Sequence, residues 1–259
     1  MNSPGAGENP TWVSPRPPAQ RIHVAGQGYE VQRIVRPAID MRADRVYLLT
    51  DPPKTELKPY HSLVLKQLKA AGIEVLVRLC EVWDPNAVVG EMGRIAEAER
   101  GNHVYVNLGT GPKTCAIGGS LAAMLWGFDA YYPKVDYEAD PVALPQDFPV
   151  KSQTEILTFH LDPPSGDVLA VLELLSEKGG RPTRKKEVVE RLRERGFLKQ
   201  GSSAQADQNV ADRVLKRALE WGFLDSEGEG RRRRLRLNGR GVAGRKMFSH
   251  LSARAANEE

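Results

Sequence analysis

The chain has 259 residues, of which 41% are hydrophobic, so it is long enough to bury one or two hydrophobic cores. No apolar run reaches the roughly 18 residues that a membrane-spanning helix needs, so a membrane role is excluded and a cytoplasmic location is expected. The net charge is +4, but it divides into −3 over residues 1–164 and +7 over residues 165–259, an asymmetry that favours a nucleic-acid-binding module in the second half.

The first residues of the chain predict no folded element. They are rich in Pro, Gly, Ser and Asn and lack the apolar middle of a signal peptide, so we expect a disordered tail over 1–20. The two cysteines, Cys80 and Cys115, indicate no disulfide framework, and we expect both to be small buried hydrophobic residues. No histidines or cysteines show the close spacing of metal ligands, so neither a metal site nor a cofactor is predicted.

Between residues 21 and 132, short apolar runs alternate with segments whose apolar residues recur at helical spacing. We predict strands over 21–25, 45–50, 74–79, 103–108 and 129–132, and helices over 29–41, 62–71, 86–100 and 113–126. Such βαβ units form a parallel sheet that helices cover on both faces. The fold class predicted for residues 21–150 is therefore α/β, with a Rossmann-like doubly wound sheet that would serve as a sensor domain.

Two glycine-bearing turns follow the first and fourth predicted strands. Ligands of open parallel sheets bind beyond the carboxyl ends of the strands, where the strand order reverses, so these two turns are the candidate site. The second turn suits a phosphodiester, because glycines expose backbone N–H groups and because a helix N-terminus and Lys113 favour an anion. Thr110 is a candidate cap of that helix. The two turns comprise Gly26, Gln27, Gly28 and Tyr29, and Asn107, Leu108, Gly109, Thr110, Gly111, Pro112, Lys113 and Thr114.

Neither turn matches a common nucleotide-binding motif. A Walker A loop places Gly directly before Lys, but Pro112 separates Gly111 from Lys113, and Val31 stands where the dinucleotide fingerprint has its third glycine. ATP hydrolysis and a nicotinamide-dependent oxidoreductase are therefore disfavoured. Tight βα turns that bind nothing are the alternative for both segments.

The second half of the chain predicts a winged helix-turn-helix domain. A strand-like stretch over 155–161 and a Pro-rich turn lie within 151–166, which we expect to be a linker. The elements predicted beyond it are helices over 167–176, 184–195 and 207–221, a return strand over 231–237 and a last helix over 239–253. Three helices followed by a basic hairpin are the order of elements in a winged helix, which we predict for residues 167–259.

The third of these helices is the candidate recognition helix. Gln and Asn suit base edges, Arg and Lys suit phosphates or guanine, and the arginine-rich strand after the helix suits the DNA backbone or a minor groove. A solvated charged surface is the alternative for both elements. The predicted contacts to double-stranded DNA are Gln208, Asn209, Arg213, Lys216, Arg217, Arg231, Arg232, Arg233, Arg234 and Arg236.

A family resemblance adds to this interpretation. The chain resembles archaeal CARF (CRISPR-associated Rossmann fold) transcriptional regulators with a C-terminal winged helix, through GQGYEVQRIV at 26–35 and ADRVYLL at 43–49. Residues 107–113 are similar to the second CARF motif, although they have Thr-Gly-Pro-Lys where many members have a glycine pair before Thr and Lys or Arg. The resemblance implies a homodimer that senses a cyclic oligoadenylate, or another nucleotide, through the two turns and regulates transcription in CRISPR antiviral defence.

An enzyme is the alternative hypothesis. Some CARF domains are ring nucleases, and here Lys113 and Thr110 would stabilise the phosphorane charge while a ribose 2′-hydroxyl attacks, without a metal ion. The histidines on predicted strands, His23 and His103, are expected to be structural. Glu97 and Glu99 are expected to be solvated carboxylates, so no general acid or base is predicted among them.

Overall fold

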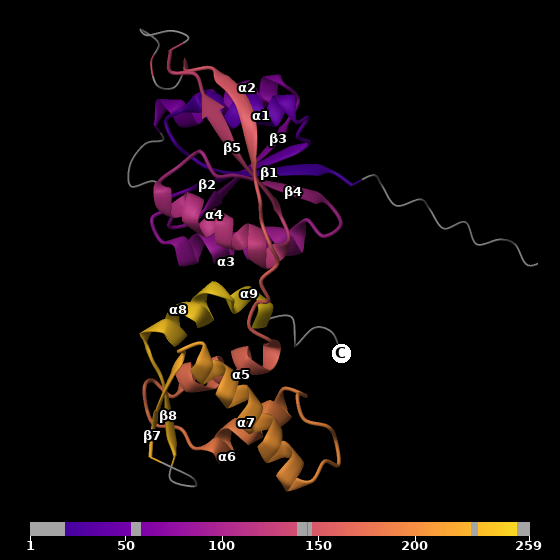
Figure 1. The fold of residues 1–259 in the computed structure, drawn as a ribbon, viewed down its shortest axis with the longest axis vertical. Helices are drawn as coiled ribbons and strands as arrows, with labels where there is room; N and C mark the ends of the chain where they lie inside the picture. The colour runs from indigo at the N-terminus through magenta and orange to yellow at the C-terminus, as the bar shows by residue number, and fades with distance from the viewer. Residues whose placement is uncertain (1–18, 53–57, 139–143, 145–146, 229–232, 253–259) are drawn as a thin grey trace, which may run out of the picture.

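The computed structural model describes residues 19–52, 58–138, 144, 147–228 and 233–252, and strands and helices alternate in its first half as predicted. The strands there are β1 (Arg21–Gly26), β2 (Arg45–Thr50), β3 (Glu74–Leu79), β4 (His103–Asn107), β5 (Asp129–Val135) and β6 (Val150–Ile156). The helices are α1 (Val31–Asp40), α2 (Pro59–Ala70), α3 (Pro85–Ala98) and α4 (Lys113–Trp126). Figure 1 shows α1 and α2 on one face of the sheet and α3 and α4 on the other. We call residues 19–156 the α/β part.

The sheet has the strand order β3-β2-β1-β4-β5-β6, in which β1 to β5 are parallel. The chain builds β1, β2 and β3 outward in one direction and then returns to place β4 on the other side of β1. The strand order therefore reverses between β1 and β4, where Ala25 pairs with Asn107. This is the predicted Rossmann-like doubly wound sheet, and the turns after β1 and β4 start side by side at its carboxyl edge.

The sixth strand corrects the predicted linker over 151–166. The strand-like stretch expected over 155–161 is instead β6, which pairs antiparallel with β5 from Ala130 opposite Ile156 to Val135 opposite Val150. Because β6 is an edge strand with mostly exposed side chains, its sequence lacks the apolar alternation that marks a half-buried strand. The connection to the next helix is thus confined to residues 157–165.

Residues 166–252, which we call the helical part, carry the remaining elements. They are α5 (Gly166–Glu177), α6 (Lys185–Glu194), α7 (Ala204–Glu220), β7 (Leu224–Glu227), β8 (Arg234–Leu237), α8 (Gly239–Met247) and α9 (Ser249–Ser252), and β7 pairs antiparallel with β8. Helix α7 begins earlier than the predicted 207, because the Ser203 side chain accepts a hydrogen bond from the Ala206 N–H and caps it. Among the described residues, no helix combines the length and the apolarity that crossing a bilayer requires.

Apolar clusters lie on both faces of the sheet and inside the helical part. The face under α3 and α4 buries Ile22, Val24, Met92, Ile95 and Val106; the face under α1 and α2 buries Ala25, Ile34, Val46, Leu48 and Leu68; and the helical part buries Leu169, Leu172, Leu175, Leu192 and Leu215. Leu125 and Trp126, at the end of α4, pack against the cluster of the helical part. The end of α4 is thus a point where the two parts share apolar contacts.

Helices α8 and α9 lie directly against α3 (Figure 1). A Cβ atom at Gly90 would lie 2.9 Å from the Met247 carbonyl oxygen, and one at Gly93 would lie 2.2 Å from Nε2 of His250. The ring of Trp126 stands edge-on to the His250 ring, with the centroids 5.2 Å apart. Two glycines on α3 therefore form the notch that seats the end of the helical part.

Burial of His23 on β1 makes stability depend on pH. The side chain is 1% exposed, its Nδ1 is hydrogen-bonded to the Tyr131 hydroxyl at 3.0 Å, and burial lowers the pKa of His23 to about 4. The unfolded chain, in which a histidine pKa is about 6.5, binds the proton more tightly. The free energy of unfolding should therefore fall as the pH drops from about 6.5 to about 4, by on the order of 3 kcal/mol from this group.

Urea unfolding of His23→Gln across that pH range tests this expectation. The variant should lose this component of the pH dependence, whereas His160→Gln, whose side chain is 67% exposed, should keep it. If the free energy of unfolding of His23→Gln depended on pH as that of the unchanged protein does, the expectation would be wrong.

Candidate functional site

The two predicted turns meet at the carboxyl edge of the sheet. A Cβ atom at Gly28 would lie 3.0 Å from the Gly111 amide nitrogen, and one at Gly26 would lie 2.5 Å from the Cys115 Sγ. Gly111 has a φ of +74°, and a Cβ there would lie 3.1 Å from the Gly26 Cα. The backbones of the turns are therefore in direct contact, which requires glycine at these positions.

Asn107, the last residue of β4, holds the second turn. Its side chain is buried; Nδ2 donates a hydrogen bond to the Arg33 carbonyl oxygen at 2.7 Å, and Oδ1 accepts one from the Gly109 N–H at 2.9 Å. With both ends of its amide engaged inside the protein, Asn107 shapes the turn. Leu108 is also buried, so these two members of the predicted set lie beneath the surface of the site.

The accessible groups of the site come from both turns. Tyr29 is 60% exposed after β1, and Gly111 and Lys113 are exposed after β4, while Gln27 and Gly28 are partly exposed between them. An aromatic ring, a backbone amide and an ammonium group therefore border the same edge. This combination suits a ligand with a flat base and a phosphate.

Thr110 is placed differently from its predicted roles. It is 4% exposed, its hydroxyl has no hydrogen-bond partner among the described residues, and the N-cap of α4 is Pro112 without a side-chain cap. The predicted capping by Thr110 is therefore wrong. Thr114 has a structural contact, because its hydroxyl donates to the Val82 carbonyl oxygen at 2.8 Å and ties α4 to the loop before α3.

The N-terminus of α4 gives the site a preference for anions. The first N–H groups of a helix lack intrahelical acceptors, and the helix dipole places partial positive charge there. Lys113 adds a full charge at the first position of α4. Burial raises the pKa of the nearby Cys115 thiol to about 12, so this group stays neutral and adds no opposing charge. The arrangement can bind a phosphodiester through backbone amides and one ammonium group.

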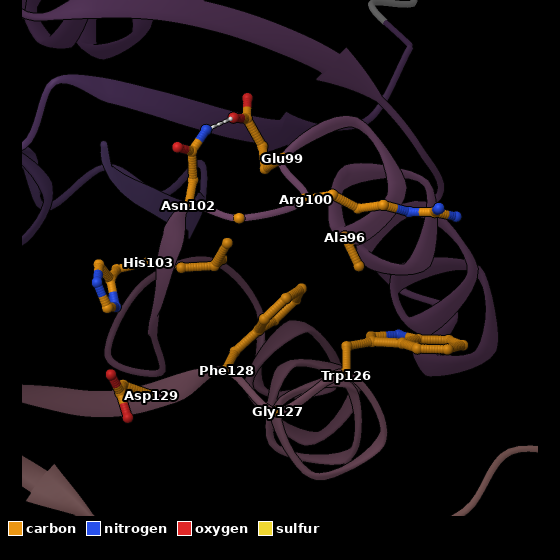
Figure 2. A pocket seen from close by; sticks show the side chains of 11 residues that line it. Ala96, Glu99, Arg100, Asn102, His103, Trp126, Gly127, Phe128 and Asp129 are labelled. Carbon is orange, nitrogen blue, oxygen red and sulfur yellow. Dashed lines mark hydrogen bonds between the residues drawn. The ribbon is translucent and has the colours of Figure 1, made fainter. Parts of the chain in front are cut away.

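A separate pocket lies at the opposite, amino edge of the sheet, where β4 and β5 begin. Its volume is about 280 Å³, and Figure 2 shows His103 and Asp129 on one side and Phe128 and Trp126 on the other. Ligand pockets commonly enclose roughly 300 to 1,000 Å³, so this one is too small for a cyclic oligonucleotide. His103, expected to be a structural histidine, is the first residue of β4 and is exposed at the edge of this pocket.

Glu99, which lines the same pocket, also corrects a prediction. It is 4% exposed instead of solvated, and its carboxylate accepts hydrogen bonds from the Tyr47 hydroxyl at 2.5 Å, Arg45 Nη1 at 2.5 Å and Asn102 Nδ2 at 2.7 Å. Figure 2 shows the bond from Asn102. Burial opposes ionisation, but these bonds outweigh it and lower the pKa of Glu99. The carboxylate is thus occupied in joining β2 to α3.

The helical part has a groove between α6, α7 and β8. Two of the predicted DNA-binding residues, Gln208 and Arg233, line it. Four cationic residues that were not predicted line it as well: Arg184, Lys185, Lys186 and Arg193. The run of three cations at the start of α6 was a visible signal for them. Basic residues at the start of α6, on α6 and next to β8 thus converge on one concave surface.

Two acidic residues of α7 lie in the same groove and are paired. Lys185 bonds to Asp212 at 2.7 Å, and Arg193 bonds to Asp207, which is 2% exposed and also accepts from the Ser202 hydroxyl at 2.5 Å. These bonds fix α6 against the N-terminal half of α7. The relative placement of the two helices that form the groove is therefore set by ion pairs as well as by apolar packing.

The other predicted residues of α7 do not line this groove. Arg213 and Arg217 line a second hollow beside α5, and Arg217 donates to Asp167 at 3.0 Å. Asn209 and Lys216 are exposed and bond along the helix to Gln205 and Glu220. Arg234 and Arg236 lie on β8, while Arg231 and Arg232 lie outside the described residues.

The fold and the site define a Rossmann-like α/β protein with an anion-favouring edge at the reversal of strand order. The α/β part matches a family model described as "HFX_2341_N:-like, N-terminal" over residues 21–138. The chain is also similar to the "Uncharacterized protein MJ1513" of Methanocaldococcus jannaschii, at 24% identity over 191 residues. That match covers 62% of this chain and 57% of the relative.

Two solved structures show distant likeness. Csm6 from Enterococcus italicus, bound to cyclic hexa-2'-fluoro-hexa-dAMP, has a TM-score of 0.41 and 10% identity, with 78% of this chain and 56% of that chain covered. Can2 from Sulfobacillus thermosulfidooxidans, in complex with cyclic tetra-adenylate, has a TM-score of 0.39 and 12% identity, with 92% and 68% covered.

The contact between the two turns predicts a specific cost for substitution. Gly111 and Gly127 both have left-handed φ values, of +74° and +70°, so alanine at either position should cost about 1 kcal/mol of stability. A Cβ at Gly111 would in addition press on Gly26, whereas one at Gly127 meets nothing within 4 Å. In urea unfolding, Gly111→Ala should be destabilised by about 1 to 3 kcal/mol more than Gly127→Ala. Equal losses would show that the two turns can separate freely.

Proposed function

We propose that this chain is a ligand-responsive DNA-binding regulator. The edge formed by the two turns binds an anionic nucleotide, for which the CARF resemblance favours a cyclic oligoadenylate, and the helical part is a winged helix-turn-helix domain that binds double-stranded DNA. The observation that carries the proposal is the contact of Gly28 with Gly111 at the reversal of strand order. Two turns that are far apart in the sequence meet there, where doubly wound sheets bind ligands.

The chemistry of the edge supports a cyclic oligoadenylate. Its phosphodiesters need positive charge, which Lys113 and the first amides of α4 supply, and its adenines need flat surfaces, which the exposed ring of Tyr29 offers. Both groups are exposed at the same edge of the sheet.

A homodimer is part of the proposal. Helix α4 presents Ile117 and Leu121, 55% and 39% exposed, one turn apart on the helix that starts at the site. A cyclic oligoadenylate of even size is itself symmetric, so two copies of the edge related by a two-fold axis match its symmetry. The apolar face of α4 is the surface proposed for the second copy.

The helical part supports DNA binding by its order of elements and by its charge. Three helices are followed by an antiparallel β7–β8 hairpin, and basic residues of α6 and of the segment before β8 converge on the groove that α7 also lines. Residues 165–259 carry a net charge of +7, which favours a polyanionic partner. We assign Gln208 and the α6 cations to the DNA-facing side, together with the β7–β8 hairpin as the wing.

The ring-nuclease alternative is less well supported by the geometry. Of the two residues that it requires, Lys113 is exposed but the hydroxyl of Thr110 is buried. Stabilising a phosphorane would need both groups at the reacting phosphate. Binding without cleavage therefore agrees better with the arrangement of the site.

Helix α4 supplies a physical connection between sensing and DNA binding. It begins at Lys113 in the proposed ligand site and ends at Trp126, whose ring contacts His250 of the helical part. A ligand that binds one placement of α4 better than another would shift the helical part with it.

Calorimetric titration with cyclic tetra-adenylate and cyclic hexa-adenylate tests the sensor. We expect binding at one ligand per two chains and a loss of about 10-fold or more in Lys113→Ala, because a charge-assisted contact is removed. Lys69→Ala, an exposed lysine in the last turn of α2, removes the same charge elsewhere and should bind as the unchanged protein does. No heat with either ring would refute this ligand class, and recovery of linear product would favour the ring nuclease.

Salt-dependent DNA binding tests the helical part. Replacing Arg233 and Arg234 by alanine should weaken binding to all sequences and flatten the slope of log K against log salt by about 1 to 2, because each phosphate contact releases a counterion. A variant with Arg36→Ala and Lys69→Ala loses the same two charges from α1 and α2 and should keep the slope. An unchanged slope in the first variant would refute the wing.

A further inference from the structure

We propose that Arg33 is a positioning residue of the candidate ligand site, which holds the Asn107–Gly111 turn in its shape from two directions. The inference deepens the proposed function and rests on it for the identity of the ligand, but the positioning is argued from the contacts of the protein alone. Arg33 lies in the first turn of α1, directly after the other turn of the site. It was not among the predicted site residues.

The side chain of Arg33 ties α1 to the end of β5. Nη1 bonds to the Glu30 carboxylate at 2.6 Å, and Nη2 donates to the Tyr132 hydroxyl at 2.7 Å and to the Pro133 carbonyl oxygen at 3.3 Å. The guanidinium carbon also lies 5.0 Å from the centroid of the Tyr132 ring. A planar group with several donors can hold two strand residues and the N-cap residue of α1 at once.

Arg33 holds the Asn107–Gly111 turn first through its contact with Pro133. Its ring occupies the space beside Gly109, where a Cβ would lie 2.6 Å from Pro133 Cδ. Because Arg33 bonds to the carbonyl oxygen of Pro133, it sets how closely that ring presses on the turn. Glycine at 109 is thus explained by a neighbour that Arg33 holds in place.

Arg33 also holds the turn through its own backbone. The carbonyl oxygen of Arg33 accepts a hydrogen bond from Asn107 Nδ2, and Asn107 Oδ1 in turn accepts the Gly109 N–H. One residue of α1 therefore determines both the amide contact and the packing contact of Gly109. The amides that follow Gly109 are those that the ligand site presents.

The free-energy cost of burying the Arg33 guanidinium argues that this residue serves to position the turn. Arg33 is 8% exposed, and its Nε has no hydrogen-bond partner among the described residues. A buried charge with an unsatisfied donor is a poor choice for stability alone, because an apolar side chain avoids both penalties. Arg33 is also too buried to contact the ligand, so its effect must pass through the turn.

Amide hydrogen exchange without ligand separates positioning from a general structural role. In Arg33→Lys, which keeps the charge but loses the fork of donors, we expect exchange over residues 108–111 to be at least 10-fold faster, with β1 and β4 unchanged. Arg36→Lys, on the same helix but 58% exposed in its side chain, should change neither. Faster exchange throughout the sheet, or no change at the turn, would overturn the inference.

A milder variant and a binding measurement complete the test. Tyr132→Phe removes one acceptor of Arg33 and should loosen the same turn even if Arg33→Lys fails to fold; an unchanged turn there would again overturn the inference. With cyclic tetra-adenylate, Arg33→Lys should bind at least 10-fold more weakly at a temperature well below its Tm, where the variant is folded. If the unchanged protein binds no cyclic oligoadenylate, the proposed function fails and the exchange data alone decide the role of Arg33. If both proteins bind equally well, the inference fails and the function stands.

Discussion

The contact between two glycine turns is the constraint on which the α/β part depends. Strands β1 and β4 are neighbours in the sheet, so the turns that leave them must cross the same small area. They can do so because Gly26, Gly28 and Gly111 have no side chains there and because Gly111 adopts a left-handed conformation. Gly26 is buried by this contact, whereas Gly28 is partly exposed and Gly111 is exposed at the surface of the site.

Much of the sheet could be predicted because it is encoded locally. Helix α4 and strands β2 and β3 have the predicted bounds, since their apolar residues recur at the spacing of their own element. Strand β6 was misplaced, because an exposed edge strand lacks that signal and is defined by its pairing with β5. Glu99 was misjudged for a similar reason: Arg45 and Tyr47, which bury it, are more than 50 positions away.

The candidate site also contains residues that a local sequence pattern predicts and residues that it does not. Its glycines and Lys113 could be found, because a tight turn before a helix has a local signature. Arg33 could not, because its role comes from Tyr132 and Pro133, about 100 positions further along the chain. In the helical part, the basic character was visible in the composition, but helical geometry places Gln208 and Arg213 in different hollows.

The glycine notch on α3 has a consequence for how this chain can evolve. Gly93 leaves the space that the His250 ring fills, and Trp126 closes it from the side. Any larger residue at position 93 would need a smaller one at position 250. Substitutions that keep the protein stable must therefore change the two positions together. Each part has its own apolar cluster, yet at this contact the sequence of one part cannot change without a change in the other. A helical part taken from another protein would therefore need a residue at position 250 that fits the space beside Gly93, or a matching change in α3.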